Sequence, residues 1–433
     1  MKKFNLCNIS VSISGICFWI LSLSCSQIAE AQFVKGADIG WLQQMEATGY
    51  KFYDSTGEQK SCLQILKDKG INTIRLRVWV NPSNDRINGH CSKAEVVTMA
   101  QRAKTIGMRI MIDFHYSDSW ADPSKQNKPA SWAGHPFSQL LTDLYDHTYN
   151  VLDTLKSAGV VPDWVQVGNE ITFGMLWPDG STSNWSQLAQ LLNKGYDATK
   201  AVDSSIKVVI HVDQGNNNSR FRTFFDNARN NNVRYDVIGM SYYPYWLGSD
   251  YTATINNLGI NLIDMASRYG KEVMVVETGG DYTLVQDTYD MLVAEINKVK
   301  SVPNNKGLGV IYWEPEGEKS WSGYQLSCWG SDGKPTAALN AFLLNPLGIN
   351  MIKSSPGLKI YPNPNLGGVL KIEFQPSGIT SVIRIFSMNG TLLKEQKLDH
   401  VTNDSININL APGIYLVNVE TGREKIFREL VVQ

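Results

Sequence analysis

Short apolar runs and longer helical patterns alternate along most of the chain. Each run has seven residues rich in β-branched and aromatic types, as buried strands do, and the runs cover residues 33–39, 73–79, 109–115, 164–170, 207–213, 237–243, 272–278 and 309–315. Helix-like patterns lie over residues 61–70, 93–107, 137–159, 184–202, 221–231, 254–270 and 285–300. Eight strands with helices between them predict an α/β fold, a TIM (β/α)8 barrel. An open doubly wound sheet is the alternative, but no Gly-x-Gly-x-x-Gly follows the first run.

The pattern changes after residue 344, so we assign residues 32–344 to the barrel. Residues 345–357 contain Pro, Gly and Ser and predict a linker. The segment 358–433 then shows short alternating strands separated by turn signals, in KIYPNPN, GVLKIEF, SVIRIFSMNG, INLAPGIYLVNVET and EKIFRELVVQ. This pattern predicts a second, small all-β sandwich domain.

The first 31 residues have the features of a secretory signal peptide. Lys2 and Lys3 precede an apolar run over residues 11–23, and Ala29 and Ala31 provide small residues before a cleavage point. A lipid anchor on Cys25 is the alternative, although the preceding Ser-Leu-Ser is a poor match to a lipobox. We therefore expect a secreted or cell-surface protein.

Charge and composition narrow the class of partner. The chain has 433 residues, a formal net charge of −1 and 10% aromatic residues. Nucleic acids and anionic membranes require a basic face, so a neutral ligand is favoured and we expect no nucleic-acid partner. We also expect a monomer. Aromatic faces suit sugar rings, although most aromatic residues in any protein are packing residues.

Three cysteines remain after the predicted signal peptide, Cys62, Cys91 and Cys328. An odd number allows at most one intrachain bridge. Cys62 and Cys91 flank the second predicted strand in an exported protein, so we predict that they pair and that Cys328 is free. The sequence has no clustered Cys/His spacing of a structural zinc site.

Two glutamates end predicted strands, which is an unusual place for a charge. Glu170 follows Asn169 at the end of the fourth strand, and Glu277 ends the seventh. Either one alone would often be a structural carboxylate. Strand ends four and seven face each other across a barrel mouth, where two carboxyls can approach to the ~5–5.5 Å of retaining glycosidases. We predict that one of Glu170 and Glu277 protonates the leaving oxygen while the other attacks the anomeric carbon, and that Asn169 binds the sugar 2-hydroxyl.

Polar and aromatic residues at the other strand ends predict a cleft. Arg77 is expected to orient Glu277 and keep it ionised, with an ordinary ion pair as the alternative. His115 and His211 are equally compatible with a buried structural role. About half of the tryptophans are compatible with simple packing against loops. The predicted substrate-binding residues are Arg77, His115, Asp118, Trp120, Asn169, His211, Tyr242, Tyr243, Trp246 and Trp313.

Several blocks together resemble glycoside hydrolase family 53, the arabinogalactan endo-β-1,4-galactanases. They are GADIGWLQQMEATG, INTIRLRVWVNP, IDFHYSDSWADPSKQNKPASW, VQVGNEIT, SYYPYW and VVETG. The resemblance covers residues 33–344 and implies a barrel that cleaves β-1,4-galactan with retention, with Glu170 as acid/base and Glu277 as nucleophile. Some bacterial members hold calcium in the loop after the eighth strand, but this loop is short and has few acids, so we expect no metal or other cofactor.

The C-terminal segment resembles the type A sorting domain of the type IX secretion system, through YPNPN, the Met-Asn-Gly turn and LAPGIYLV. This resemblance implies export through that secretion machinery. A small carbohydrate-binding module is the alternative, but no row of aromatic residues is visible.

Three functions are compatible with these features. The leading hypothesis is a secreted retaining endo-β-1,4-galactanase with a polysaccharide substrate. A related endo-β-glycanase, such as a mannanase or cellulase, is the nearest alternative. A non-catalytic polysaccharide-binding barrel is the third, and the presence of both glutamates argues against it.

Overall fold

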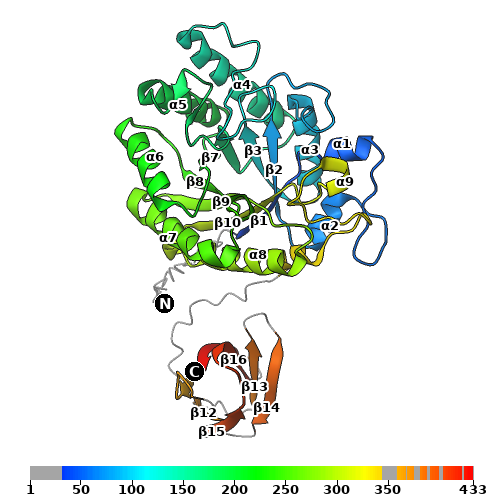
Figure 1. Ribbon diagram of the computed structural model, residues 1–433, viewed down its shortest axis with the longest axis vertical. Helices are drawn as coiled ribbons and strands as arrows, with labels where there is room; N and C mark the ends of the chain where they lie inside the picture. Colours follow the sequence, from blue (N-terminus) through cyan, green and yellow to red (C-terminus); the bar gives the residue numbers. More distant parts are fainter. Residues whose placement is uncertain are drawn as a thin grey trace, which may run out of the picture.

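The computed structural model of the protein describes residues 32–343, 358–366, 368–374, 381–387, 391–398, 403–421 and 424–432. The predicted signal peptide and the predicted linker lie outside these residues. Residues 32–343 form a closed barrel surrounded by helices, as predicted (Figure 1). Within the described ranges, no helix has the length and apolar character needed to cross a membrane.

Eight parallel strands close the barrel. Each pairs with the next along the ring, and the last pairs with the first. They match the eight predicted runs and are β1 (Val34–Asp38), β2 (Thr73–Val78), β3 (Arg109–Phe114), β4 (Trp164–Val167), β7 (Lys207–Val212), β8 (Val237–Tyr242), β9 (Glu272–Thr278) and β10 (Gly307–Trp313).

Helices cover the outside of the barrel because each has one apolar face. In α4, for example, Leu140, Leu144, Val151 and Leu155 are buried at helical spacing. The long helices are α3 (Lys93–Thr105), α4 (Phe137–Ser157), α5 (Trp185–Val202), α6 (Asn218–Asn230), α7 (Tyr251–Tyr269) and α8 (Val285–Lys300). The shorter elements are α1 (Leu42–Ala47), α2 (Cys62–Asp68), α9 (Lys319–Ser322), the 3-10 turns η1 (Tyr245–Leu247), η2 (Pro303–Asn305) and η3 (Ala337–Phe342), and the hairpin strands β5 (Gly174–Met175) and β6 (Gly180–Ser181).

The barrel interior has an apolar layer and a polar layer. Inward-facing residues alternate along a strand, so Met111 on β3 is followed inside by Asp113, and Trp164 on β4 by Gln166. The apolar layer contains Val34, Met111, Trp164, Val209, Val237, Met274, Val276 and Ile311. The polar layer toward the carboxyl ends includes Asp38, Arg75, Asp113 and Gln166, all fully buried. These groups form the floor of the site.

The C-terminal domain consists of two antiparallel sheets, as predicted. The first sheet is β11 (Leu358–Tyr361), β12 (Gly368–Phe374) and β15 (Asn403–Ile408), and the second is β14 (Leu392–Leu398), β13 (Ser381–Ser387), β16 (Gly413–Thr421) and β17 (Glu424–Val432). A shared core includes Leu370, Ile383, Ile406 and Val417. The predicted INLAPGIYLVNVET stretch forms β16 and contributes only its first residue, Ile408, to β15. The sequence pattern did not predict the charged β14 or the rest of β15.

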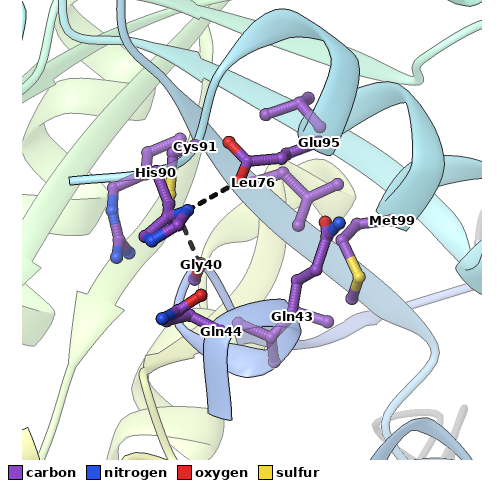
Figure 2. Close-up of a pocket in the computed structure, with 11 residues that line it drawn as sticks. Gly40, Gln43, Gln44, Leu76, His90, Cys91, Glu95 and Met99 are labelled. Atoms are coloured by element: carbon purple, nitrogen blue, oxygen red, sulfur yellow. Dashed lines mark hydrogen bonds and ion pairs between the residues drawn. The ribbon is translucent and has the colours of Figure 1, made fainter. Parts of the chain in front are cut away.

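The predicted bridge between Cys62 and Cys91 is wrong, because both cysteines are free and buried. Cys62 begins α2 and packs in the core between helices and barrel. The Cys91 thiol instead donates a hydrogen bond to the Gly40 carbonyl (3.4 Å), beside a small cavity (Figure 2). Cys328 is free, as predicted.

Candidate active site

The backbone after β4 turns Glu170 toward the barrel mouth. Gly168 has φ +83°, and a Cβ there would lie 2.6 Å from a side-chain atom of Ile171, so the turn favours glycine. Glu170 itself has φ 44°, which is uncommon for a residue with a side chain. Left-handed backbone at a strand end is typical of functional sites. The half-buried Glu170 lines the cleft.

A β-bulge on β9 directs Glu277 into the same cleft. Met240 of β8 pairs with Val275, but the next residue, Ser241, pairs with Glu277, so β9 has one extra residue there. As a result Val276 lies in the interior apolar layer and Glu277 also lies in the cleft. Bulges often redirect a side chain next to an active site.

The two carboxyl groups are close together. A carboxylate oxygen of Glu170 and one of Glu277 lie within 4.8 Å of each other, and within 4.8 Å of a His211 ring nitrogen. This spacing is close to the ~5–5.5 Å of a retaining pair and well below the ~6.5–9.5 Å of an inverting pair. The three groups also satisfy the distance pattern of a metal site, but Glu277 is already paired with Arg75 and His211 with Ser241.

The two carboxyls differ in their neighbours. Burial, and then the charge of Glu277, raise the pKa of Glu170 well above its usual value. Burial also raises the pKa of Glu277, but the adjacent Arg75 guanidinium opposes this rise. Glu170 therefore favours the protonated form, and Glu277 is the better anion.

Arg75, rather than the predicted Arg77, holds Glu277. Arg75 Nη1 lies 2.9 Å from Glu277 Oε1, and the same guanidinium contacts Asp38 (2.7 Å) and Asp113 (2.9 Å). Arg77, one inward position further along β2, pairs with Glu314 and lies 3.6 Å from Asp38. The expectation that Arg77 orients Glu277 is therefore wrong.

Arg77 lies behind the cleft wall and does not line the cleft. Its guanidinium is fully buried and packs over Trp120, with its carbon 4.5 Å from the ring centroid, and over Trp41 and Trp79 at 5.6 and 5.4 Å. Trp120 lines the cleft. Arg77 thus supports a cleft residue from behind.

Asn169 lies beside the pair and is held on several sides. Its Oδ1 accepts hydrogen bonds from Arg75 (3.0 Å) and Gln166 (3.1 Å), and its Nδ2 donates to the Ala121 carbonyl (2.9 Å). Asn169 lines the cleft next to Glu170. A 2-hydroxyl contact remains a prediction.

The cleft brings together most of the predicted residues. His115, Trp120, Asn169, Tyr243, Trp246 and Trp313 line it with the two glutamates. The Tyr243 hydroxyl donates to Glu277 Oε2 (3.3 Å), and Trp246 is 63% exposed. His115 is held by Asp113 (3.0 Å) and by the backbone N–H of Ala121 (3.1 Å), so its ring is fixed at the edge of the cleft.

Besides Arg77, three predicted substrate-binding residues lie outside the cleft lining. Tyr242 is fully buried and its hydroxyl bonds to Thr254 of α7 (2.9 Å), because alternation along β8 turns it away from the cleft. Asp118 accepts the backbone N–H groups of Asn81 and Ala130 and so joins two loops. His211 is fully buried beneath Glu170. This agrees with the alternative prediction of a buried structural histidine at a strand end.

Sequence reasoning missed several residues of the site. Tyr324 and Asp122 line the cleft from loops, and no periodic pattern marks loop residues. Arg75 and Ser241 precede two predicted residues, Arg77 and Tyr243, by two positions. Residues two apart share a strand face, so this rule was the available signal for both.

A (β/α)8 barrel with two facing glutamates at the ends of its fourth and seventh strands defines a glycoside hydrolase. The family model of glycosyl hydrolase family 53 matches residues 34–342. The chain belongs to this family. The model of the secretion system C-terminal sorting domain matches residues 359–433, which indicates a secreted or cell-surface protein.

Known proteins match the barrel over most of its length. A probable arabinogalactan endo-β-1,4-galactanase A of Neosartorya fischeri is 35% identical over 318 residues, covering 68% of this chain and 87% of that protein. An endo-β-1,4-galactanase of Bacillus subtilis is 33% identical over 308 residues, covering 65% and 70%. The solved family 53 catalytic domain of Ignisphaera aggregans has a TM-score of 0.67 and 32% identity, covering 72% and 95%.

Proposed function

We propose that this protein is a secreted endo-β-1,4-galactanase that cleaves its substrate by double displacement. The observation that carries the mechanism is the short distance between the carboxylates of Glu170 and Glu277, within 4.8 Å. No room remains between them for the water that an inverting enzyme places there.

In the first step, Glu277 attacks the anomeric carbon while Glu170 gives its proton to the glycosidic oxygen, so the bond to the leaving sugar breaks. Arg75 keeps Glu277 anionic, and the raised pKa of Glu170 keeps it protonated. In the second step, Glu170 takes a proton from water, and the resulting hydroxide displaces Glu277. The product keeps the β configuration.

The relatives favour galactan as the substrate. The Neosartorya fischeri protein is named a probable arabinogalactan endo-β-1,4-galactanase, and the Bacillus subtilis protein an endo-β-1,4-galactanase. The cleft is consistent with a polysaccharide, because Trp120, Trp246 and Trp313 and two tyrosines line its walls and aromatic faces pack against sugar rings. The C-terminal domain is the part that contacts the secretion machinery.

A product profile tests the substrate. Purified protein is incubated with potato galactan, with mannan and cellulose as controls, and reducing ends are measured. We expect oligosaccharides from galactan alone. Cleavage of mannan or cellulose at an equal rate would favour the related endo-glycanase, and no cleavage of any of them would favour a binding protein.

NMR of the first-formed product tests the mechanism. The β anomer should appear first and convert slowly to the α anomer by mutarotation. Initial appearance of the α anomer would refute double displacement.

A further inference from the structure

Ser241 contacts the proposed acid/base from the barrel interior. It faces inward from β8 and is 1% exposed. Its Oγ donates a hydrogen bond to Glu170 Oε1 (2.6 Å) and lies 2.7 Å from His211 Nε2. A serine hydroxyl has one hydrogen, so it can donate to only one of these two partners.

The tautomer of His211 decides which group donates in each hydrogen bond among Glu170, His211 and Ser241. Burial lowers the pKa of His211 well below its usual value, so the ring is neutral and has one N–H. The backbone N–H of Glu170 donates to Nδ1 (3.3 Å). Asn169 Oδ1 lies 3.1 Å from Nδ1 but already accepts from Arg75 and Gln166. Nδ1 is therefore the acceptor, and Nε2 carries the hydrogen.

We propose that Ser241 and His211 are positioning residues that hold Glu170 in a closed ring of hydrogen bonds. The Glu170 N–H donates to His211 Nδ1, His211 Nε2–H donates to the Ser241 hydroxyl, and that hydroxyl donates to Glu170 Oε1. Each group donates once and accepts once, so the buried His211 and Ser241 side chains and the half-buried Glu170 all have partners. This inference rests on the proposed function of Glu170.

The ring has two consequences for Glu170. It holds both the backbone and the side chain of a residue in the left-handed region (φ 44°), which a free backbone seldom adopts. It also occupies Oε1, so Oε2 is the oxygen that faces the substrate. The proton on Oε2 goes to the glycosidic oxygen as the bond to the leaving sugar breaks and Glu277 bonds to the anomeric carbon. Oε2 later accepts the proton of the attacking water.

Ser241→Ala tests the proposal. Loss of a hydrogen bond to the carboxylate favours protonated Glu170, so the basic limb of the pH profile of kcat/KM on galactan should move up by about one pH unit. The less well oriented carboxyl should lower kcat about tenfold with little change in KM. The ionisable groups that face Glu170 stay unchanged in this variant: Glu277, His211, Asp213, Asp122 and Tyr243.

Two further variants separate positioning from structure. Ser241→Thr keeps the hydroxyl and should keep the basic limb at its wild-type position. Ser327→Ala removes an equally buried hydroxyl from the loop after β10, outside the cleft lining, and should leave the limb unchanged.

An unshifted limb in folded Ser241→Ala would overturn the proposal, as would the same shift in Ser327→Ala. Thermal melting confirms that each variant is folded, and the alanine variants remove one atom only. Wild-type protein that leaves galactan uncut would instead refute the proposed function, and this inference with it.

Discussion

Replacing Arg75 by methionine should alter both the pH profile and the stability of the enzyme. The Arg75 side chain is fully buried and forms ion pairs of 2.7 to 2.9 Å with Asp38, Asp113 and Glu277. Methionine has a similar length but no charge. Three buried carboxylates would lose their shared cation. The main group that opposes the rise that burial causes in the pKa of Glu277 would then be gone, so Glu277 would favour its protonated form.

The structure sets the size of the shift. At 2.9 Å, two unit charges attract by about 1.4 kcal/mol in bulk water and by roughly 6 kcal/mol at an effective dielectric constant of ~20. One pH unit corresponds to about 1.4 kcal/mol, so the pKa of Glu277 should rise by at least about one unit. As the proposed nucleophile, Glu277 must be ionised to attack, so the acidic limb of kcat/KM should move to higher pH.

Removing one partner from a buried pair also destabilises the fold, by roughly 3–5 kcal/mol. At about 2.1 cal/mol/K of unfolding entropy per residue, that loss lowers the melting temperature of a barrel of this size by roughly 5–8 °C. The assay is reducing-end release from galactan between pH 3 and 9, together with calorimetry. Arg75→Lys, which keeps the charge, should shift the limb less.

Arg77→Met is the matched control. Arg77 is equally buried and pairs with Glu314, but it does not contact Glu277. We expect a comparable loss of stability and an acidic limb close to that of the wild type. A shifted limb in Arg77→Met with an unshifted limb in Arg75→Met would refute the assignment of Arg75.

Three other predictions concern the remaining features. Glu170→Gln should lower galactan turnover roughly 10²- to 10⁴-fold while binding is retained, and aryl galactosides with good leaving groups should lose less in the first step; near wild-type turnover of galactan would remove the acid/base role. Deleting residues 358–433 should leave the activity and melting temperature of the purified barrel almost unchanged and should prevent export in the native host; a loss of galactan affinity with normal export would support a binding module instead. Cys62, Cys91 and Cys328 should be alkylated in denaturant without reductant, since none of these described cysteines is bridged, and a disulfide-linked peptide of Cys62 and Cys91 in mass mapping would contradict the structure.

The sequence by itself determined the class of fold and the two glutamates. Strand and helix periods are local properties, set by which side chains alternate and which recur every three or four residues, so eight runs and their order could be read directly. Because parallel strands in a barrel share one carboxyl end, Glu170 and Glu277 had to lie at one mouth. The two-sheet C-terminal domain followed from the same alternation.

Only the tertiary structure decided how the glutamates are held. Arg75 and Arg77 both face the barrel interior from β2. Which of the two side chains reaches Glu277 depends on its height along the barrel axis relative to Glu277 in the closed barrel. The extra residue in β9 is defined only by how β9 pairs with the neighbouring strand β8. Such features arise from contacts between residues distant in sequence, and no local period encodes them. The free cysteines have the same origin, because Cys62 on α2 packs in the main core whereas Cys91, in the loop before α3, bonds to the Gly40 carbonyl.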